Sequence, residues 1–258
     1  MTATPEKDWN PETYARFRGL RLRPALDLLM QVGDVPQGDV VDLGCGDGAA
    51  AAALAQRYPT QRLVGVDLSP AMLAKAQGYA ALVAADVATW VPASPPALIF
   101  SNAALHWLPD HAALMPRLAG FLARGGVLAV QMPRQFFAPS HRFIRDIAVA
   151  LFPDRFDFSD YEAPVLTAVG YWQMLQGLGQ VETWETDYVQ HLAPADAMHP
   201  VRAFTQSTAM RPFIEKLTQA EQDRFNAAYD MALASAYPLA ADGSALLPFR
   251  RVFFVLKV

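Results

Sequence analysis

A glycine-rich turn that follows a short apolar segment constrains the fold of this chain more than any other feature. Residues 39–43 (DVVDL) are β-prone and lead directly into GCGDG at residues 44–48. An alanine-rich, helix-forming segment follows at residues 49–58. Glycine allows a backbone to turn sharply and to approach a ligand closely. A strand, a glycine turn and a helix in this order therefore predict a ligand site at the end of the strand.

Strand-like and helix-like segments alternate through the rest of the first half. We expect strands at residues 62–66, 81–85, 97–102 and 127–132, and helices at residues 69–76 and 110–123. Ser69 and Pro70 are typical of an N-cap and a first helical position. Such alternation predicts βαβ units and a mainly parallel sheet.

The pattern changes after Pro133. Residues 134–160 show no clean period, and a helix at residues 164–178 precedes an alternating strand at residues 181–192. A mostly helical segment at residues 195–237 leads to a β-prone strand at residues 249–258. These two long strands, at residues 181–192 and 249–258, are joined by a long helical segment, which suggests an antiparallel pair at the sheet edge.

We therefore expect one α/β domain over residues 1–258, doubly wound, with a mainly parallel seven-stranded sheet of Rossmann-like type and an antiparallel edge. Residues 1–30 are expected to form an N-terminal lid helix. Residues 134–160 and 195–245 are expected to form helical cap segments over the carboxyl edge of the sheet.

Composition excludes several classes of function. The formal net charge is −4, and no block of like charges suits a nucleic-acid backbone. No apolar stretch is long enough to predict a membrane span or a signal peptide. Cys45 is the single cysteine, which suits a reducing compartment. We expect a cytoplasmic monomer that acts on a small molecule without nucleic acid, membrane or metal.

Three acids stand at the ends of predicted strands. Asp42 precedes the glycine turn, and Asp67 and Asp86 follow the next two strands. Asp67 can accept hydrogen bonds from both ribose hydroxyls of a nucleoside, and Asp86 can accept one from an adenine amino group. Asp42 would repel a pyrophosphate but suits a zwitterionic, cationic ligand such as S-adenosylmethionine.

A nicotinamide cofactor is the alternative, and it would make the chain an NAD(P)-dependent oxidoreductase. The glycine pattern is GxGxG rather than the GxGxxG of dinucleotide sites. A Tyr-x-x-x-Lys or His–Asp proton donor is also not found. These features favour S-adenosylmethionine.

The same residues resemble the cofactor-binding motifs of class I S-adenosylmethionine-dependent methyltransferases. The matching segments are DLGCGDG at residues 42–48, DLSPAM at residues 67–72 and ADV at residues 85–87. The resemblance implies that S-adenosylmethionine is bound and S-adenosylhomocysteine released. The cofactor-binding residues in these segments are Asp42, Gly44, Gly46, Asp67, Leu68, Met72, Asp86 and Val87, and we also expect Tyr14 and Asn102 to bind the cofactor.

A closer resemblance, to the trans-aconitate 2-methyltransferase family, covers nearly the whole chain. The matching segments are DWNP at 8–11 with Tyr14 and Phe17, Arg23-Pro24, FSNAALHWLPDH at 100–111, LAVQMP at 128–133, MRP at 210–212 and PFRRVFF at 248–254. This resemblance implies methylation of a carboxylate of a small polycarboxylic acid, most simply trans-aconitate. Another small acid, or the carboxyl of an acyl chain, is the alternative substrate.

A carboxylate is ionised at neutral pH and needs no general base, so the site needs cations and a dry, ordered cleft. Arginine binds carboxylates bidentately. The candidate cations are Arg21, Arg23, Arg142, Arg211, Arg250 and Arg251. We favour Arg211 and Arg250, which lie in family-like segments. Strand alternation predicts that Arg250 and Arg251 face opposite sides, so that only one points into the cleft.

Aromatic and histidine side chains complete the predicted site. Trp9 is expected to contact substrate as part of a lid with Tyr14, or else to pack on the core. His106 and Trp107 are expected in a loop over the methyl donor, as the residues nearest the chemistry. His106 stands where the family carries Gln; it can donate a hydrogen bond to a substrate carboxylate, or stack.

Overall fold

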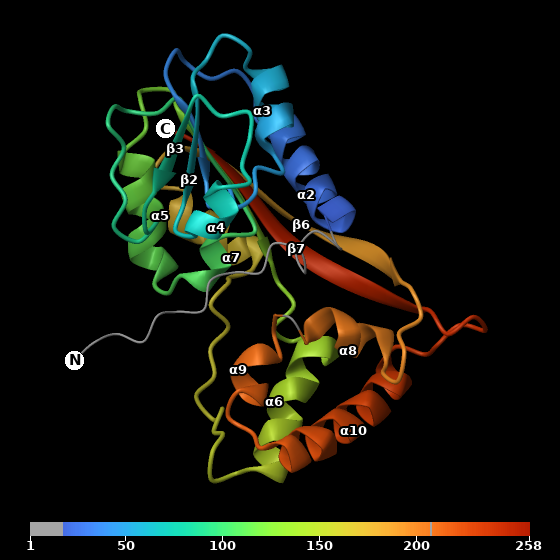
Figure 1. Ribbon diagram of the computed structural model, residues 1–258. Helices are drawn as coiled ribbons and strands as arrows, with labels where there is room; N and C mark the ends of the chain where they lie inside the picture. Colours follow the sequence, from blue (N-terminus) through green and yellow to red (C-terminus); the bar gives the residue numbers. More distant parts are fainter. Residues whose placement is uncertain (1–17, 207) are drawn as a thin grey trace. The chain divides into compact units, whose positions relative to one another are not determined.

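The structure, a computed structural model, describes residues 18–206 and 208–258 (Figure 1). Trp9 and Tyr14, which the sequence placed in the site, lie outside the described residues. The chain divides into two compact units. The first holds residues 1–133, 164–185 and 251–258, and the second holds residues 134–163 and 186–250. The segments expected as a cap fall in the second unit, and the single domain stays a prediction.

A seven-stranded sheet has the order β3-β2-β1-β4-β5-β7-β6. The strands are β1 Val40–Leu43, β2 Leu63–Asp67, β3 Ala81–Ala84, β4 Leu98–Asn102, β5 Val127–Pro133, β6 Gln180–Leu192 and β7 Ala245–Lys257. Strands β1 to β5 are parallel to one another, and β7 runs antiparallel to β5. The expected fold class, a mainly parallel sheet with an antiparallel edge, is confirmed.

The central strands are buried because they are nearly continuous apolar runs. All four residues of β1 and the first six of β5 are buried, as expected for parallel strands covered on both faces. Helices of the first unit cover the sheet, with α2 against β5, α3 against β2, and α5 against both β5 and α7. These helices are α2 Arg18–Gln31, α3 Ala51–Arg57, α4 Pro70–Leu73, α5 His111–Gly120 and α7 Ala168–Leu175.

The second unit packs helices around an apolar core of its own. Its helices are α6 Pro139–Leu151, α8 Pro200–Thr205, α9 Arg211–Ile214 and α10 Gln219–Ala236. Ile144, Phe225 and Leu233 are among the buried core residues, and α6 packs against α10. The helical pattern expected at residues 195–237 is confirmed as three helices. No helix in the described part of the chain is long and apolar enough to cross a membrane.

Helix α6 lies within residues 134–160, where helical cap structure was expected although the segment as a whole showed no clean period. Its buried positions Ser140, Ile144 and Ala148 recur every four residues. The larger apolar residues Phe143, Ile147 and Leu151 also follow helical spacing and pack against the core of the second unit.

Candidate active site

The glycine turn between β1 and α3 is shaped by contacts that only glycine permits. Gly44 has a φ of +76°, and a Cβ there would lie 2.1 Å from the Cβ of Ala104. Gly46 has a φ of +55°, and no atom lies within 4 Å of where its Cβ would be. The turn therefore packs against the loop after β4 at Gly44 and leaves open space at Gly46, where a ligand can approach the backbone.

Asp67, at the end of β2, is held in place by two backbone amides. Its Oδ2 accepts from the N–H of Gly46 at 2.8 Å, and its Oδ1 accepts from the N–H of Ser69 at 2.9 Å. Ser69 in turn caps α4, where its Oγ accepts from the N–H of Met72. A carboxylate has about four acceptor sites. Asp67 can therefore serve the turn and still accept from the two hydroxyls of a ribose.

Asp42 is buried, with 2% of its surface exposed, and its partner is a residue that the sequence did not reveal. The hydroxyl of Tyr79 donates to Asp42 Oδ2 at 2.6 Å. Burial raises the pKa of Asp42 to about 7; the Tyr79 hydrogen bond opposes this and the charge of Asp67 adds to it. A buried carboxylate of this kind is best stabilised by a cationic ligand.

The ring of Tyr79 packs against the backbone of two glycines. A Cβ at Gly48 or at Gly65 would lie 3.1 Å from this ring. Burial also raises the pKa of Tyr79, so the phenol stays protonated and donates. Nothing in a single sequence links a tyrosine before β3 to an acid on β1, because only the fold brings them together.

Cys45 lies in the same turn and is buried. Burial raises the pKa of its thiol, with the charges of Asp42 and Asp67 adding to the effect. The thiolate is thus strongly disfavoured. The residue fills space in the turn and does not serve as a nucleophile.

The remaining predicted cofactor residues surround the same strand ends. Asp86 is exposed after β3, and its Oδ1 accepts from the N–H of Ala88 at 2.8 Å. Leu68 is 58% exposed and Met72 is buried. Val87 is held through its carbonyl, which accepts from Nη2 of Arg117 at 2.7 Å. An exposed Leu68 beside the rigid carboxylate of Asp67 offers an apolar surface to an adenine ring.

Asn102 ends β4, next to β1 in the sheet. Its Oδ1 is buried and has no hydrogen-bond partner within the part of the chain that the structure describes. A buried acceptor without a donor is costly. The ammonium group of a ligand would satisfy it.

His106 and Trp107 lie on a short 3-10 helix, η1 Leu105–Trp107, after β4. Their ring centroids are 4.7 Å apart with an interplanar angle of 40°. Trp107 is 53% exposed. His111 links η1 to α7. Its Nε2 lies 2.9 Å from the carbonyl oxygen of Leu105, and its Nδ1 lies 2.6 Å from the hydroxyl of Tyr171.

The two arginines favoured from the sequence lie in the second unit, and each carries an acidic partner. Arg211 Nε lies 2.9 Å from Glu215 Oε1. Arg250 binds Asp187 bidentately, with both contacts at 2.8 Å. This pair lowers the pKa of Asp187.

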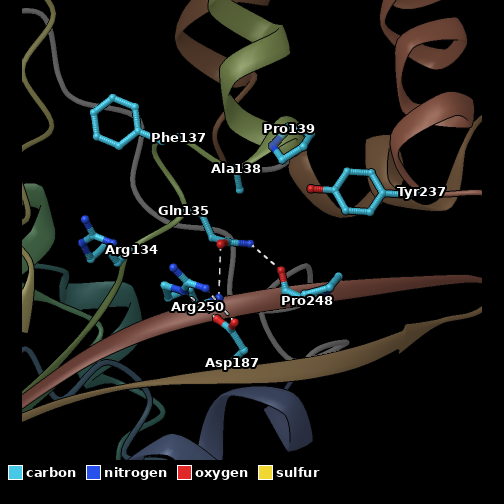
Figure 2. Close-up of a pocket in the computed structure, with 9 residues that line it drawn as sticks. All are labelled: Arg134, Gln135, Phe137, Ala138, Pro139, Asp187, Tyr237, Pro248 and Arg250. Carbon is cyan, nitrogen blue, oxygen red and sulfur yellow. Dashed lines mark hydrogen bonds and ion pairs between the residues drawn. The ribbon is translucent and has the colours of Figure 1, made fainter.

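Arg250 lines a cavity of about 440 Å³ in the second unit, and Figure 2 shows its lining side chains. Arg134, the residue after β5, is a second cation of this cavity. Gln135 links the segment after β5 to strand β7. Its Nε2 donates to the carbonyl of Pro248 at 2.9 Å, and its Oε1 accepts from the N–H of Arg250 at 3.1 Å. The sequence did not single out Arg134 or Gln135.

Comparison with known proteins shows the family to which this chain is similar. Residues 40–126 match a family model described as a methyltransferase domain. The chain is 41% identical to a trans-aconitate 2-methyltransferase of Methylobacterium radiotolerans, over 97% of this chain and 98% of that protein. It is 43% identical to that of Methylobacterium nodulans and 38% identical to that of Escherichia coli O1:K1 / APEC, over the same shares. The chain belongs to the trans-aconitate 2-methyltransferase family.

Solved structures support the fold of this family member. A Bacillus halodurans protein assigned as a methyltransferase aligns with a TM-score of 0.55 at 13% identity, over 91% of this chain and 98% of that one. The YcgJ protein of Bacillus subtilis aligns with a TM-score of 0.52 at 14% identity, over 94% and 98%. At these identities the likeness concerns the fold alone.

S-adenosylmethionine is the cofactor of this methyltransferase, and the residues of the first unit fit it. Asp42 is a buried acid suited to a cation, and Asn102 Oδ1 is a buried acceptor without a donor among the described residues. Gly46 leaves open space beside the turn. Among the described residues, no group of three or more His, Cys, Asp or Glu is arranged to hold a metal ion.

Proposed function

We propose that this protein transfers a methyl group from S-adenosylmethionine to a carboxylate of trans-aconitate. The assignment of the substrate rests on the relatives named trans-aconitate 2-methyltransferase, which match 97% of the chain at about 40% identity. A carboxylate substrate also suits a chain that offers arginines in the cavity of its second unit, Arg134 and Arg250.

The first unit holds the cofactor through residues at the carboxyl ends of its strands. Asp67 accepts from the ribose hydroxyls, Asp86 from the adenine amino group, and Asp42 and Asn102 face the ammonium of the methionine end. Gly44 and Gly46 allow close approach, while Leu68, Met72 and Val87 form the apolar wall around the base. When bound, the cofactor supplies an electrophilic methyl group on a sulfonium.

No residue of this chain needs to remove a proton. The substrate carboxylate is ionised above about pH 5, and displacement at the methyl group consumes that charge and the positive charge on sulfur together. The protein contributes alignment and exclusion of water. His106 and Trp107 border the reacting carboxylate, with His106 as a hydrogen-bond donor, and Arg211 and Arg250 bind the others.

The test is a pH profile of kcat together with identification of the product. A methyl ester that hydrolyses in mild base is expected, with kcat nearly flat from about pH 6.5 to 8.5, because kcat reports ionisations in the loaded enzyme. A rise in kcat governed by one group with a pKa near 7 would contradict the proposal. It would indicate a protein base, such as His106, acting on a less acidic substrate group.

A further inference from the structure

Arg251 differs from its neighbour Arg250 in burial and in surroundings. Arg250 is exposed, whereas Arg251 is only 3% exposed, as strand alternation predicts. A guanidinium costs several kcal/mol to bury unless it has partners. One partner of Arg251 is Gln131 on β5, whose Oε1 accepts from Nη1 at 3.2 Å.

Gln131 is completely buried, and only part of its amide is satisfied. Its orientation is fixed, because a guanidinium only donates and must face the amide oxygen. The Nε2 group therefore points away from Arg251, and it has no hydrogen-bond partner in residues 18–206 and 208–258. A buried donor left in this state calls for an explanation, such as a ligand that is absent.

These groups lie at the edge of the sheet where ligands bind. Arg251 is paired with Pro133, the last residue of β5, and Gln131 is paired with Asn102, the last residue of β4. Doubly wound sheets bind their ligands at the carboxyl ends of the strands. The acceptor of Asn102 and the donor of Gln131 thus lie on neighbouring strands at the same edge. The acceptor suits the cationic cofactor, and the donor suits an anion.

We propose that Arg251 and Gln131 form the binding site for one carboxylate of the substrate, an assignment that rests on the proposed carboxylate methylation. The guanidinium supplies positive charge and the amide Nε2 supplies a second N–H donor. Both are buried, so the contact forms away from water, where charge-assisted hydrogen bonds are strong. With the reacting carboxylate bordered by His106 and Trp107, one carboxylate of trans-aconitate remains for Arg250 or Arg211.

Gln131→Glu is the decisive variant. It gives Arg251 an ionic partner at the position of the present amide oxygen, so the fold is kept and the melting temperature does not fall. The new carboxylate occupies the place of the donor and repels the substrate. We expect KM for trans-aconitate to rise at least tenfold while Kd for S-adenosylhomocysteine stays within about twofold of wild type.

Gln56→Glu, the same substitution at an exposed position of α3, is the matched control and should leave KM unchanged. Gln131→Met removes the donor without adding charge and should raise KM less than Gln131→Glu, which keeps the test available if the glutamate variant does not fold. If Gln131 serves only the core, both folded variants will show wild-type KM, and the inference is then wrong.

Failure of the proposed function is a separate outcome. If wild-type protein does not methylate trans-aconitate but methylates another carboxylate, the proposed substrate is wrong, and the same variants assayed on that acid decide the inference. If wild-type protein methylates no carboxylate and calorimetry with its S-adenosylhomocysteine complex detects no carboxylate binding, both proposals are wrong.

Discussion

The two carboxylates at the ends of β1 and β2, beside the glycine turn, have opposite environments. Asp67 is partly exposed and receives two backbone N–H groups. Asp42 is buried and receives one phenolic hydroxyl. Asp67 is therefore placed to accept from neutral hydroxyl donors, whereas Asp42 has a pKa of about 7 and changes charge near neutral pH.

Replacing Asp67 with Ala should weaken binding of S-adenosylhomocysteine at least tenfold. Two charge-assisted hydrogen bonds to the ribose are lost, each contributing about 1.5–3 kcal/mol. Asp67→Asn keeps acceptor capacity for the turn and should lose less affinity. Calorimetry on the folded variants measures both, and an unchanged Kd in Asp67→Ala would show that this residue does not bind the ribose.

Tyr79→Phe should shift the pH dependence of cofactor binding. The Tyr79 hydrogen bond lowers the pKa of Asp42, so its loss raises that pKa further. Asp42 is ionised only above its pKa, and an ammonium ligand prefers the ionised form. Affinity for S-adenosylhomocysteine should thus fall in the variant near pH 7 and recover toward pH 8.5.

Calorimetry between pH 6 and 8.5 tests this shift, with Tyr58→Phe as a control because the Tyr58 hydroxyl bonds to the carbonyl of Gly33 instead. An equal loss of affinity at every pH would mean that Tyr79 acts only by packing.

At the scale of elements, the η1 turn depends on the start of α5. His111 begins α5, and its two ring nitrogens contact the Leu105 carbonyl and the Tyr171 hydroxyl. The carbonyl only accepts, so Nε2 carries the hydrogen and Nδ1 accepts from Tyr171. The neutral histidine joins α7 to the loop that presents His106 and Trp107.

His111→Ala should lower the free energy of unfolding by about 2–5 kcal/mol, because two buried polar groups lose their partner. Thermal or urea unfolding measures this loss. We also expect kcat to fall, because η1 carries His106 and Trp107. His191→Ala, at an exposed position, is the control. Wild-type kcat in a folded His111→Ala protein would show that η1 needs no such support.

The stability of the wild type should also fall in acid because of His111. Burial lowers its pKa below 6.5. As the pH falls through about 6.5, the unfolded chain takes up this proton while the folded protein does not, so stability is lost. The His111→Ala variant should lose less stability than wild type between pH 7 and 5, as measured by urea unfolding.

The sequence predicted the strands and the cofactor because the relevant signals are local. An apolar run and a glycine turn lie within a few residues of each other, as at Asp42 and Gly44, and Asp67 directly ends the next apolar run along the chain. The sequence predicted helical structure within residues 134–160 but not the bounds of α6, because loop residues flank the helix inside that segment. Tyr79 and Gln131 were missed because their partners are distant in sequence and meet only through strand register.

The choice between Arg250 and Arg251 shows the same limit. Alternation predicted opposite faces, and burial confirms this. It did not tell which face is the ligand side, and Arg250 was favoured. The structure gives Arg250 an acidic partner, Asp187, at the surface, and gives Arg251 a buried amide at the carboxyl edge of the sheet.

At the scale of the whole molecule, the net charge of −4 opposes a trianionic substrate. Binding therefore relies on local positive potential from particular arginines. The cavity of the second unit supplies Arg134 and Arg250 against one lining acid, Asp187.

Arg211→Ala and Arg250→Ala should each raise KM for trans-aconitate about tenfold or more, since each removes a charge-assisted contact. Kd for S-adenosylhomocysteine should hardly change. Arg224→Ala, at an exposed position of α10, controls for the loss of one charge. Steady-state kinetics measures these KM values. If neither substitution changes KM, the substrate does not bind to Arg211 or Arg250.

The most direct test of the central claim is a comparison of kcat/KM for methyl transfer across a panel of small carboxylic acids. The panel should include trans-aconitate, other di- and tricarboxylates and an acyl-chain monocarboxylate, all assayed with wild-type protein and S-adenosylmethionine. We predict that trans-aconitate has the highest kcat/KM and yields a monomethyl ester. Faster turnover of the monocarboxylate, or no transfer to any polycarboxylate, would contradict this account.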